Sequence, residues 1–251
     1  MLLHRFVKAL IIGSLLLMPV AFLRKDILPP PAGLRQELNE APKQVAVQVG
    51  LIDTTVNGVK YSIQPRYAYD LYGLVVSLHD SDSWYDYVHK EWNDYLNVVD
   101  LCVVWGENIR RDAYKRVNYS QTQTECFWST LSSEAARAFD GSAMSNNHLI
   151  TDNPKMARRL RQVRIGDEVH FRGYLADYTI HKDGATTGSR VNSVTRTDTG
   201  NGACEVVYIQ EFEILRATNR VWRTIGRIAV WAFGLSVLAW FALPLKYHSN
   251  D

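Results

Sequence analysis

Residues 165–180 read IGDEVHFRGYLADYTI, and this stretch decides the expected fold. The pair Gly166-Asp167 indicates a turn, and apolar and polar residues then alternate from Val169 to Ile180. Alternation with a period of two is typical of a strand with one face on the core. The strand also contains a glycine, Gly173, as strands of small five-stranded barrels often do. The stretch therefore predicts a long strand of a small β-structure.

The rest of the chain body extends this prediction to a mainly β domain. Asn57-Gly58 is a strong hairpin signal between two strand-like runs. Other expected strands cover 69–78, 101–105, 115–120, 169–180 and 204–215, and short helices are expected at 133–138 and 154–163. One long insertion and a small helix before the penultimate strand favour a closed or partly open barrel, similar to the oligonucleotide- and oligosaccharide-binding (OB) fold, over a β-sandwich.

Two apolar segments predict membrane-spanning helices at the ends of the body. Residues 228–245 contain no charge, and at about 1.5 Å per residue they nearly cross a hydrocarbon core of about 30 Å. Residues 9–23 follow a basic start, so they are either a cleaved signal peptide or an uncleaved signal anchor; Arg24 and Lys25 favour the anchor. The expected organisation is an anchor at 1–25, a Pro-containing linker at 26–42, a β-rich domain at 43–219, and a helix with its tail at 220–251.

The charge distribution fits a membrane protein and argues against a nucleic-acid partner. Basic residues are concentrated beside the two apolar segments, whereas acidic residues outnumber basic ones in the body. A binder of single strands needs a positive groove. The basic residues near the ends of the body favour a cytoplasmic body, but long domains translocate largely regardless of charge. With the secretory-type start, we expect a two-pass protein of the bacterial inner membrane with a periplasmic domain.

The three cysteines leave two interpretations open. Cys102 and Cys126 are close enough in sequence to close a short disulfide loop, which is the pairing we expect. Alternatively, all three thiols are reduced and pack as small hydrophobic groups, because Cys102 and Cys204 lie in apolar runs. No Cys/His spacing in the sequence indicates a zinc finger.

Four motifs resemble those of a family of uncharacterised bacterial membrane-anchored proteins: DLCVVWGEN at 100–108, SNNHLI at 145–150, GDEVHFRGYL at 166–175 and SVTRTDTGNGACE at 193–205. The resemblance spans about residues 69–215. It implies an extracytoplasmic domain tethered by an N-terminal helix, and it implies no activity. The second helix, at the C-terminal end, rests on the residues alone.

Two residues are weak candidates for catalysis. Asp198 belongs to an Asp-Thr-Gly triplet like that of aspartic proteases, but apolar residues do not precede it, so a Gly-rich turn is the preferred interpretation and calcium binding a lesser one. His148 is a possible general base, although no serine or cysteine nucleophile is tied to it by spacing. A structural hydrogen bond is the simpler role for His148.

A run of histidines and acids at residues 79–94 is a candidate metal site. Its potential ligands are His79, Asp86, His89 and Asp94. On a helix, Asp86 and His89 share a face at a spacing of three residues. A solvated or aromatic-acidic surface is the competing interpretation, and the sequence implies no cofactor.

Two hypotheses for the function follow. The first is a non-catalytic, membrane-tethered β-barrel that binds another envelope protein or helps to assemble a membrane complex. The second is a metal-assisted hydrolase of an envelope substrate, in which His79, His89, Asp94 or His148 converge on one site. The sequence favours the first and leaves enzymatic activity undecided.

Overall fold

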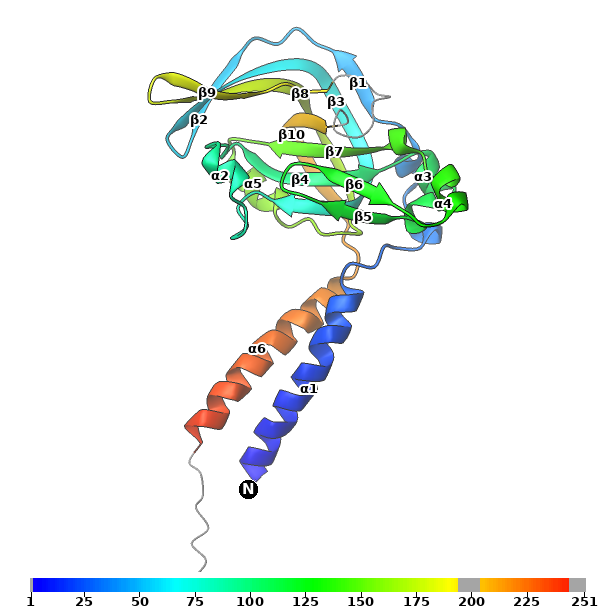
Figure 1. The fold of residues 1–251 in the computed structure, drawn as a ribbon, viewed down its shortest axis with the longest axis vertical. Helices are drawn as coiled ribbons and strands as arrows, with labels where there is room; N and C mark the ends of the chain where they lie inside the picture. Colours follow the sequence, from blue (N-terminus) through cyan, green and yellow to red (C-terminus); the bar gives the residue numbers. More distant parts are fainter. Residues whose placement is uncertain (1, 194–203, 244–251) are drawn as a thin grey trace, which may run out of the picture. The chain divides into compact units, whose positions relative to one another are not determined.

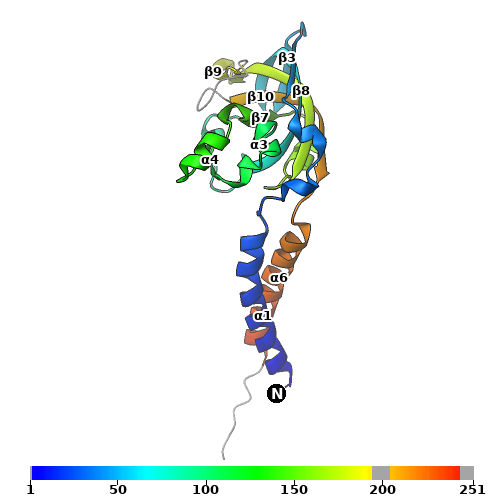
Figure 2. The same cartoon turned by 90° about the vertical axis from the view of Figure 1, so that its right-hand side faces the viewer.

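The computed structural model describes residues 2–193 and 204–243 and divides the chain into two compact units. One unit combines the segment up to Ile27 with the segment from Asn219 onward, and the other runs from Leu28 to Thr218. The first unit contains two long helices and the second is mainly β-sheet (Figures 1 and 2).

The helical unit is made of α1 (Leu2–Arg24) and α6 (Arg220–Ala242). Both helices are long and apolar enough to cross a membrane. At about 1.5 Å per residue, each is about 35 Å long, which exceeds a hydrocarbon core of about 30 Å. These helices match the two spans expected from the sequence in position and in apolar character.

Small residues bring the two helices together. The buried residues of this unit recur at every seventh position: Val7, Ser14 and Ala21 in α1, and Ala229 and Ser236 in α6. A Cβ atom added to Gly226 would lie 3.3 Å from the Cβ atom of Ala21, and the His4 and Trp240 rings meet edge to face. The end of α1 thus lies beside the start of α6, and the start of α1 beside the end of α6, so the helices are antiparallel. Small residues at a heptad spacing allow such close packing inside a bilayer.

The β unit contains one eight-stranded sheet. Its strands are β1 (Lys43–Ala46), β2 (Ile52–Val56), β3 (Val59–Asp80), β4 (Asn97–Val104), β7 (Met144–Ile150), β8 (Glu168–Lys182), β9 (Ala185–Arg190) and β10 (Cys204–Arg216). The hydrogen-bonded order is β1-β3-β4-β7-β10-β8-β9, and β8 also pairs with β3. The neighbours β3, β4, β7, β10 and β8 therefore lead back to β3. Only β7 and β10 run parallel in this series.

Two short-range signals of the sequence have clear structural counterparts. Asn57 and Gly58, both with positive φ, form the turn between β2 and β3, as the hairpin signal predicted. In β8, a Cβ atom at Gly173 would lie 2.2 Å from the carbonyl oxygen of Tyr208 in β10. Only glycine allows these two strands to approach so closely.

The insertion between β4 and β7 covers one face of the sheet. It holds the hairpin β5 (Asn118–Gln121) and β6 (Cys126–Ser129), with short helices α3 (Glu107–Arg110), η3 (Ala113–Lys115), α4 (Ser133–Ala138) and η4 (Gly141–Ala143). A disulfide joins Cys102 of β4 to Cys126 of β6, the pairing expected from the sequence. Cys204 is the free cysteine.

The remaining helices are short, and the segment expected to be a linker packs on the β unit. Helix α5 (Pro154–Leu160), expected at 154–163, is capped by Asn153, whose side chain accepts two backbone N–H groups. In the acidic stretch after β3, only α2 (Val88–Glu91) is helical. Residues 29–42 include η1 (Pro31–Gly33) and η2 (Gln36–Asn39), and the segment packs on the domain because Leu38 is fully buried there.

Two apolar clusters lie on opposite faces of β4. One is built around the inward residues Leu101 and Val103 with partners such as Phe171 of β8. The other contains Cys102 and Val104, which pack against the insertion. Every residue of β4 is consequently buried, and this includes its polar ones.

Candidate functional site

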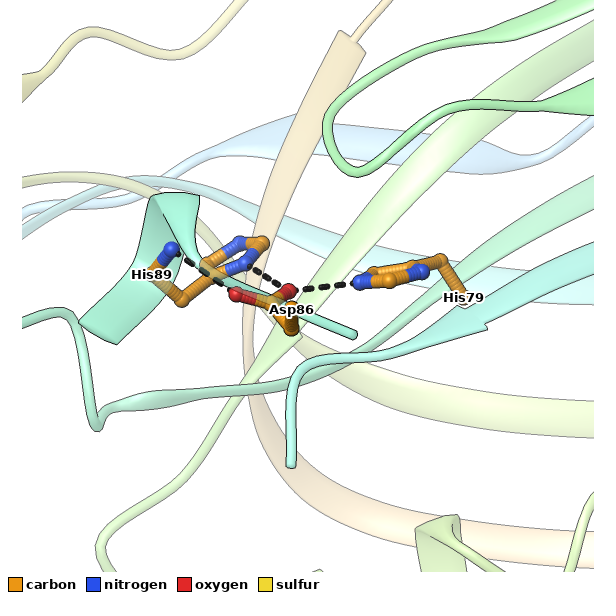
Figure 3. Close-up of side chains that lie close together, drawn as sticks. All are labelled: His79, Asp86 and His89. Carbon is orange, nitrogen blue, oxygen red and sulfur yellow. Dashed lines mark hydrogen bonds and ion pairs between the residues drawn. The ribbon is translucent and has the colours of Figure 1, made fainter. Parts of the chain in front are cut away.

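Three side chains of the predicted metal-ligand run meet in the interior of the β unit. His79 lies near the end of β3. Asp86 and His89 lie in the segment between β3 and β4, called the excursion below, and His89 belongs to its short helix α2. Oδ2 of Asp86 lies 2.6 Å from Nε2 of His79 and 2.7 Å from Nδ1 of His89. Figure 3 shows this carboxylate between the two rings. The three side chains are at most 4% exposed, so this cluster is not a solvated surface.

The excursion that carries this cluster is held by its own hydrogen bonds. Oδ1 of Asp86 accepts the backbone N–H of His89 at 3.0 Å and so satisfies a donor in the first turn of α2. Oε1 of Gln123, in the β5–β6 connection, accepts the N–H groups of Tyr87 and Val88. The covering hairpin therefore fixes the start of α2.

A chain of buried hydrogen bonds continues from His89 into the sheet. Nδ2 of Asn97 lies 2.8 Å from Nε2 of His89 and donates to Oδ1 of Asp100, also at 2.8 Å. The same carboxylate oxygen lies 2.7 Å from Nδ1 of His148, on the neighbouring strand β7. Asn146 of β7 lies 3.4 Å from Nε2 of His148. The network thus links His79, His89 and His148 across β3, α2, β4 and β7.

The predicted site residues are only partly brought together. Asp94 is buried but its Oδ2 accepts a hydrogen bond from the Tyr178 hydroxyl at 2.6 Å, and the group of potential ligands found in the described residues contains His79, Asp86 and His89. His148 makes the hydrogen bond to Asp100 that its simpler interpretation requires. Asp198 lies outside the described residues.

The network keeps its two central carboxyl groups ionised. Burial acts to raise the pKa of Asp86, but hydrogen bonds from His79 and His89 outweigh it and hold that pKa below its ordinary value. Burial likewise acts to raise the pKa of Asp100, and the opposing interaction with His148 holds it below the ordinary value. Both groups are therefore acceptors at neutral pH.

The free cysteine beside this network is poorly suited to nucleophilic attack. Cys204 of β10 lies opposite Asn146 in the register of the sheet. Burial raises the pKa of its thiol to about 11, although a hydrogen bond with Asn146 acts against this. The thiol is therefore protonated at neutral pH, whereas a catalytic cysteine needs its thiolate. A Cys204–His148 nucleophile pair has no support in these surroundings.

The sequence reasoning missed Asn97, Asp100 and Asn146. Asn97 and Asp100 are polar residues in an otherwise apolar strand, NVVDLCVV at 97–104, whereas Asn146 lies in a polar run within MSNNHLI at 144–150. Such residues are either on a solvated face or in a buried hydrogen-bond network. The nearly continuous apolar character of the first strand was the available signal for burial on both of its faces.

No family model, curated protein or solved structure matches the chain.

Proposed function

We propose that the chain is a two-pass protein of the bacterial inner membrane whose periplasmic β domain binds another envelope protein. The observation that carries this proposal is a run of exposed aromatic side chains in the excursion between β3 and β4. Their exposed fractions are 91% for Trp84, 53% for Tyr85, 66% for Tyr87 and 50% for Trp92. We name these four residues the aromatic segment.

The pairing order of the strands supports a closed five-stranded barrel of the OB type as the scaffold. The series β3, β4, β7, β10 and β8 returns to its first strand, and its third and last strands in chain order, β7 and β10, are parallel. Helix α5 lies between the third and fourth of these strands in the chain. In OB folds, the loop between the first two strands takes part in binding. The aromatic segment occupies that loop.

The disulfide supports the proposed compartment. A disulfide joins Cys102 to Cys126. Disulfides persist in oxidising environments and are rare where glutathione and thioredoxin keep thiols reduced. The two apolar helices support attachment to the bilayer, with α1 as the uncleaved anchor. A domain between two such helices faces a single side of the membrane.

The aromatic segment has the properties of a protein-binding surface. Asp86 and His89 are buried between its members, so the segment is anchored from within by the network of Figure 3. Fixed tryptophan and tyrosine side chains lose little conformational freedom on binding, and such residues dominate the energetics of interfaces. Large exposed aromatic side chains that gather on one loop indicate an interaction site.

Charge favours a protein over a lipid surface as the partner. Asp82 and Glu91 are exposed in the same excursion, whereas Lys90 donates to the backbone carbonyl of Ser83. A loop that binds anionic lipid normally surrounds its aromatic residues with free basic side chains. The partner we propose therefore offers an apolar surface with a basic margin.

The geometry gives the metal-assisted hydrolase less support. The histidines it needs do converge on one network, but they are almost fully buried and hydrogen-bonded to neighbouring side chains. A substrate must reach its catalytic groups, and side chains that are closed to solvent do not allow this. The buried network is better suited to hold the loop in place.

The test begins with a photo-cross-linking amino acid placed at Trp84 in living cells, with the same residue at Val45, 64% exposed on β1, as the control. We expect a discrete product at position 84 only, and mass spectrometry then identifies the partner. The two purified proteins are then mixed in detergent. The double variant Trp84→Ala, Trp92→Ala should weaken their association at least tenfold, and Val45→Ala should leave it unchanged.

Three outcomes would overturn the proposal. Lipid adducts at position 84 would make the segment a membrane contact, and a product of twice the chain mass would make the partner a second copy. An association of the purified proteins that is insensitive to the double variant would remove the aromatic segment from the interface.

A further inference from the structure

We propose that His79, Asp86 and His89 bind one Zn²⁺ ion, which fastens the excursion carrying the aromatic segment to the end of β3. One ligand atom from each residue lies within 4.8 Å of the other two, and all three residues are buried. Two imidazole nitrogens and one carboxylate oxygen form a donor set that Zn²⁺ prefers. The inference does not rest on the proposed partner.

All three side chains must shift to admit the ion, including the two ring nitrogens, which lie within 4.8 Å of each other. Zinc binds nitrogen and carboxylate oxygen at about 2.0–2.2 Å, so ligands of a tetrahedral site lie about 3.3–3.5 Å apart. The two contacts of Asp86 Oδ2, at 2.6 and 2.7 Å, must therefore lengthen by less than about 1 Å. Rotation of the Asp86 side chain away from the rings opens this space, because the carboxylate lies between them (Figure 3).

The protons now shared in the cluster occupy the positions that the ion would take. A carboxylate only accepts hydrogen bonds, so the ring nitrogens facing Asp86 are the donors. When zinc binds these nitrogens, the Nδ1 proton of His89 moves to its Nε2 and the Nε2 proton of His79 moves to its Nδ1, so both rings stay neutral. Nε2 of His89 then needs an acceptor in place of the Asn97 amide group that it faces now.

Asn97 contains the acceptor that this exchange requires. Its Oδ1 atom is buried and has no hydrogen-bond partner among the described residues. Rotation of the amide by half a turn brings this oxygen to His89 Nε2, and the two amide atoms are interchangeable in shape. The same rotation gives up the hydrogen bond that Nδ2 of Asn97 donates to Oδ1 of Asp100, which keeps its bond with His148. Metal-bound histidines regularly donate their other ring N–H to such an oxygen. The unpartnered oxygen is thus the acceptor that a zinc-bound His89 would use.

The donor set also discriminates between metals. Calcium and magnesium prefer oxygen ligands, and only one of the three residues supplies oxygen. Cys102 and Cys126 are joined in a disulfide, so neither offers a thiolate to the site. Zinc and its spectroscopic substitute Co²⁺ are therefore the appropriate probes.

The experiment uses the full chain in detergent, purified without a histidine tag and freed of metal by chelation. Co²⁺ is titrated and followed by visible absorption, and Zn²⁺ then competes. With a water molecule as the fourth ligand beside the three side chains, we expect one Co²⁺ per chain with the intense bands of a four-coordinate ion and without thiolate charge-transfer bands. We also expect its displacement by one equivalent of Zn²⁺, and a rise of Tm with Zn²⁺ that excess chelator reverses.

Variants assign the ligands. His79→Gln and His89→Gln should each weaken binding at least 100-fold, whereas His148→Gln should retain it, although His148 is as buried and also bonded to an aspartate. Asn97→Leu should weaken binding about tenfold, as loss of an outer-shell partner does. Near-ultraviolet circular dichroism checks that each variant is folded.

Measurements on the wild-type chain alone can overturn the inference. The test therefore stands even if the variants do not fold. Binding of less than 0.1 equivalent at about 10 µM metal, or only the weak spectrum of a six-coordinate surface ion, would contradict it. Equal loss of binding in the His148→Gln control would place the ion elsewhere. A partner that still binds the metal-free protein would leave the proposed function intact while this site fails.

Discussion

The two faces of β4 are both buried, but they are filled in different ways. Leu101 and Val103 point into an apolar cluster between the strands, whereas Asp100 on the opposite face belongs to a hydrogen-bond network and Cys102 to a disulfide. The inward face is stabilised by packing, which is insensitive to pH and redox state. The outward face depends on charge, hydrogen bonds and a covalent bond, all of which respond to the surroundings of the protein.

Shortening Leu101 tests the inward face and should have the largest effect. Leu101 is fully buried, so Leu101→Ala loses transfer free energy and leaves a cavity, lowering the unfolding free energy by about 4 kcal/mol. Urea unfolding of the full chain in detergent, followed by near-ultraviolet circular dichroism, measures this. Leu131→Ala, at a fully exposed position, should change stability by less than about 0.5 kcal/mol. Equal effects of the two variants would contradict the assignment of the core.

Removal of the disulfide tests the covalent part of the outward face. The bond joins residues separated by 24 positions, and a loop of this size gives about 3.5 kcal/mol of stabilisation by chain entropy. The double variant Cys102→Ser, Cys126→Ser should lose that amount in urea unfolding, as should reduced wild type. Cys204→Ser, which retains the bond, is the control. Unfolding of the wild type that is indifferent to reductant would remove the disulfide from this comparison.

Neutralising Asp100 tests the polar part of the same face. Asp100→Asn retains the size of the side chain but loses the charge that accepts hydrogen bonds from His148 and Asn97. Burial of imperfectly paired polar groups should then lower the unfolding free energy by about 2 kcal/mol. Asp53→Asn, which alters an exposed hydrogen bond to Ser62, should have an effect below about 0.5 kcal/mol. If the two variants lose the same stability, the network contributes nothing beyond a surface interaction.

Lowering the pH should also distinguish the two faces of β4, and its effect on the unfolding free energy is the smallest that we expect. The pKa values of Asp86 and Asp100 are lowered in the folded protein, so their stabilisation is fully present above the ordinary carboxyl pKa, about 3.9. It is lost as the pH falls through the lowered values, because the unfolded chain binds protons first. Unfolding free energies measured between pH 5 and pH 2 should therefore fall more steeply for wild type than for Asp100→Asn. The curve of unfolding free energy against pH for Leu101→Ala should run parallel to that of wild type. If the curve for Asp100→Asn also ran parallel to wild type, the role of this carboxylate would be contradicted.

The local parts of the fold could be predicted from the sequence because they depend on nearby residues. The Asn57-Gly58 turn, the cap at Asn153 and the long strand around Gly173 each have a signal within a few positions. The apolar helices α1 and α6 are recognisable for the same reason. Their lengths and compositions alone satisfy the requirement of a bilayer.

The network could be predicted only in part because its members come from separate elements. The run at residues 79–94 indicated His79, Asp86 and His89, but it also included Asp94, which pairs with Tyr178. Asp100 is fully buried on the face of β4 that also carries Cys102, and nothing in the strand itself identifies its partner His148. The hairpin β5–β6, which the disulfide joins to Cys102, pairs with no strand of the main sheet among the described residues. Contacts of this kind leave no periodic signal in the strands they cover.

The seven-residue spacing in the helix pair has a consequence for the order of assembly. The surface of α1 that carries Ser14 and Ala21 is matched by Ala229 and Ser236 of α6, a helix synthesised only after the whole β unit. In the two-pass topology that we propose, α1 therefore enters the bilayer before its partner helix exists, with its small-residue stripe unpaired. Because lipid chains fill a shallow stripe poorly, pairing with α6 is the step that completes the packing of α1.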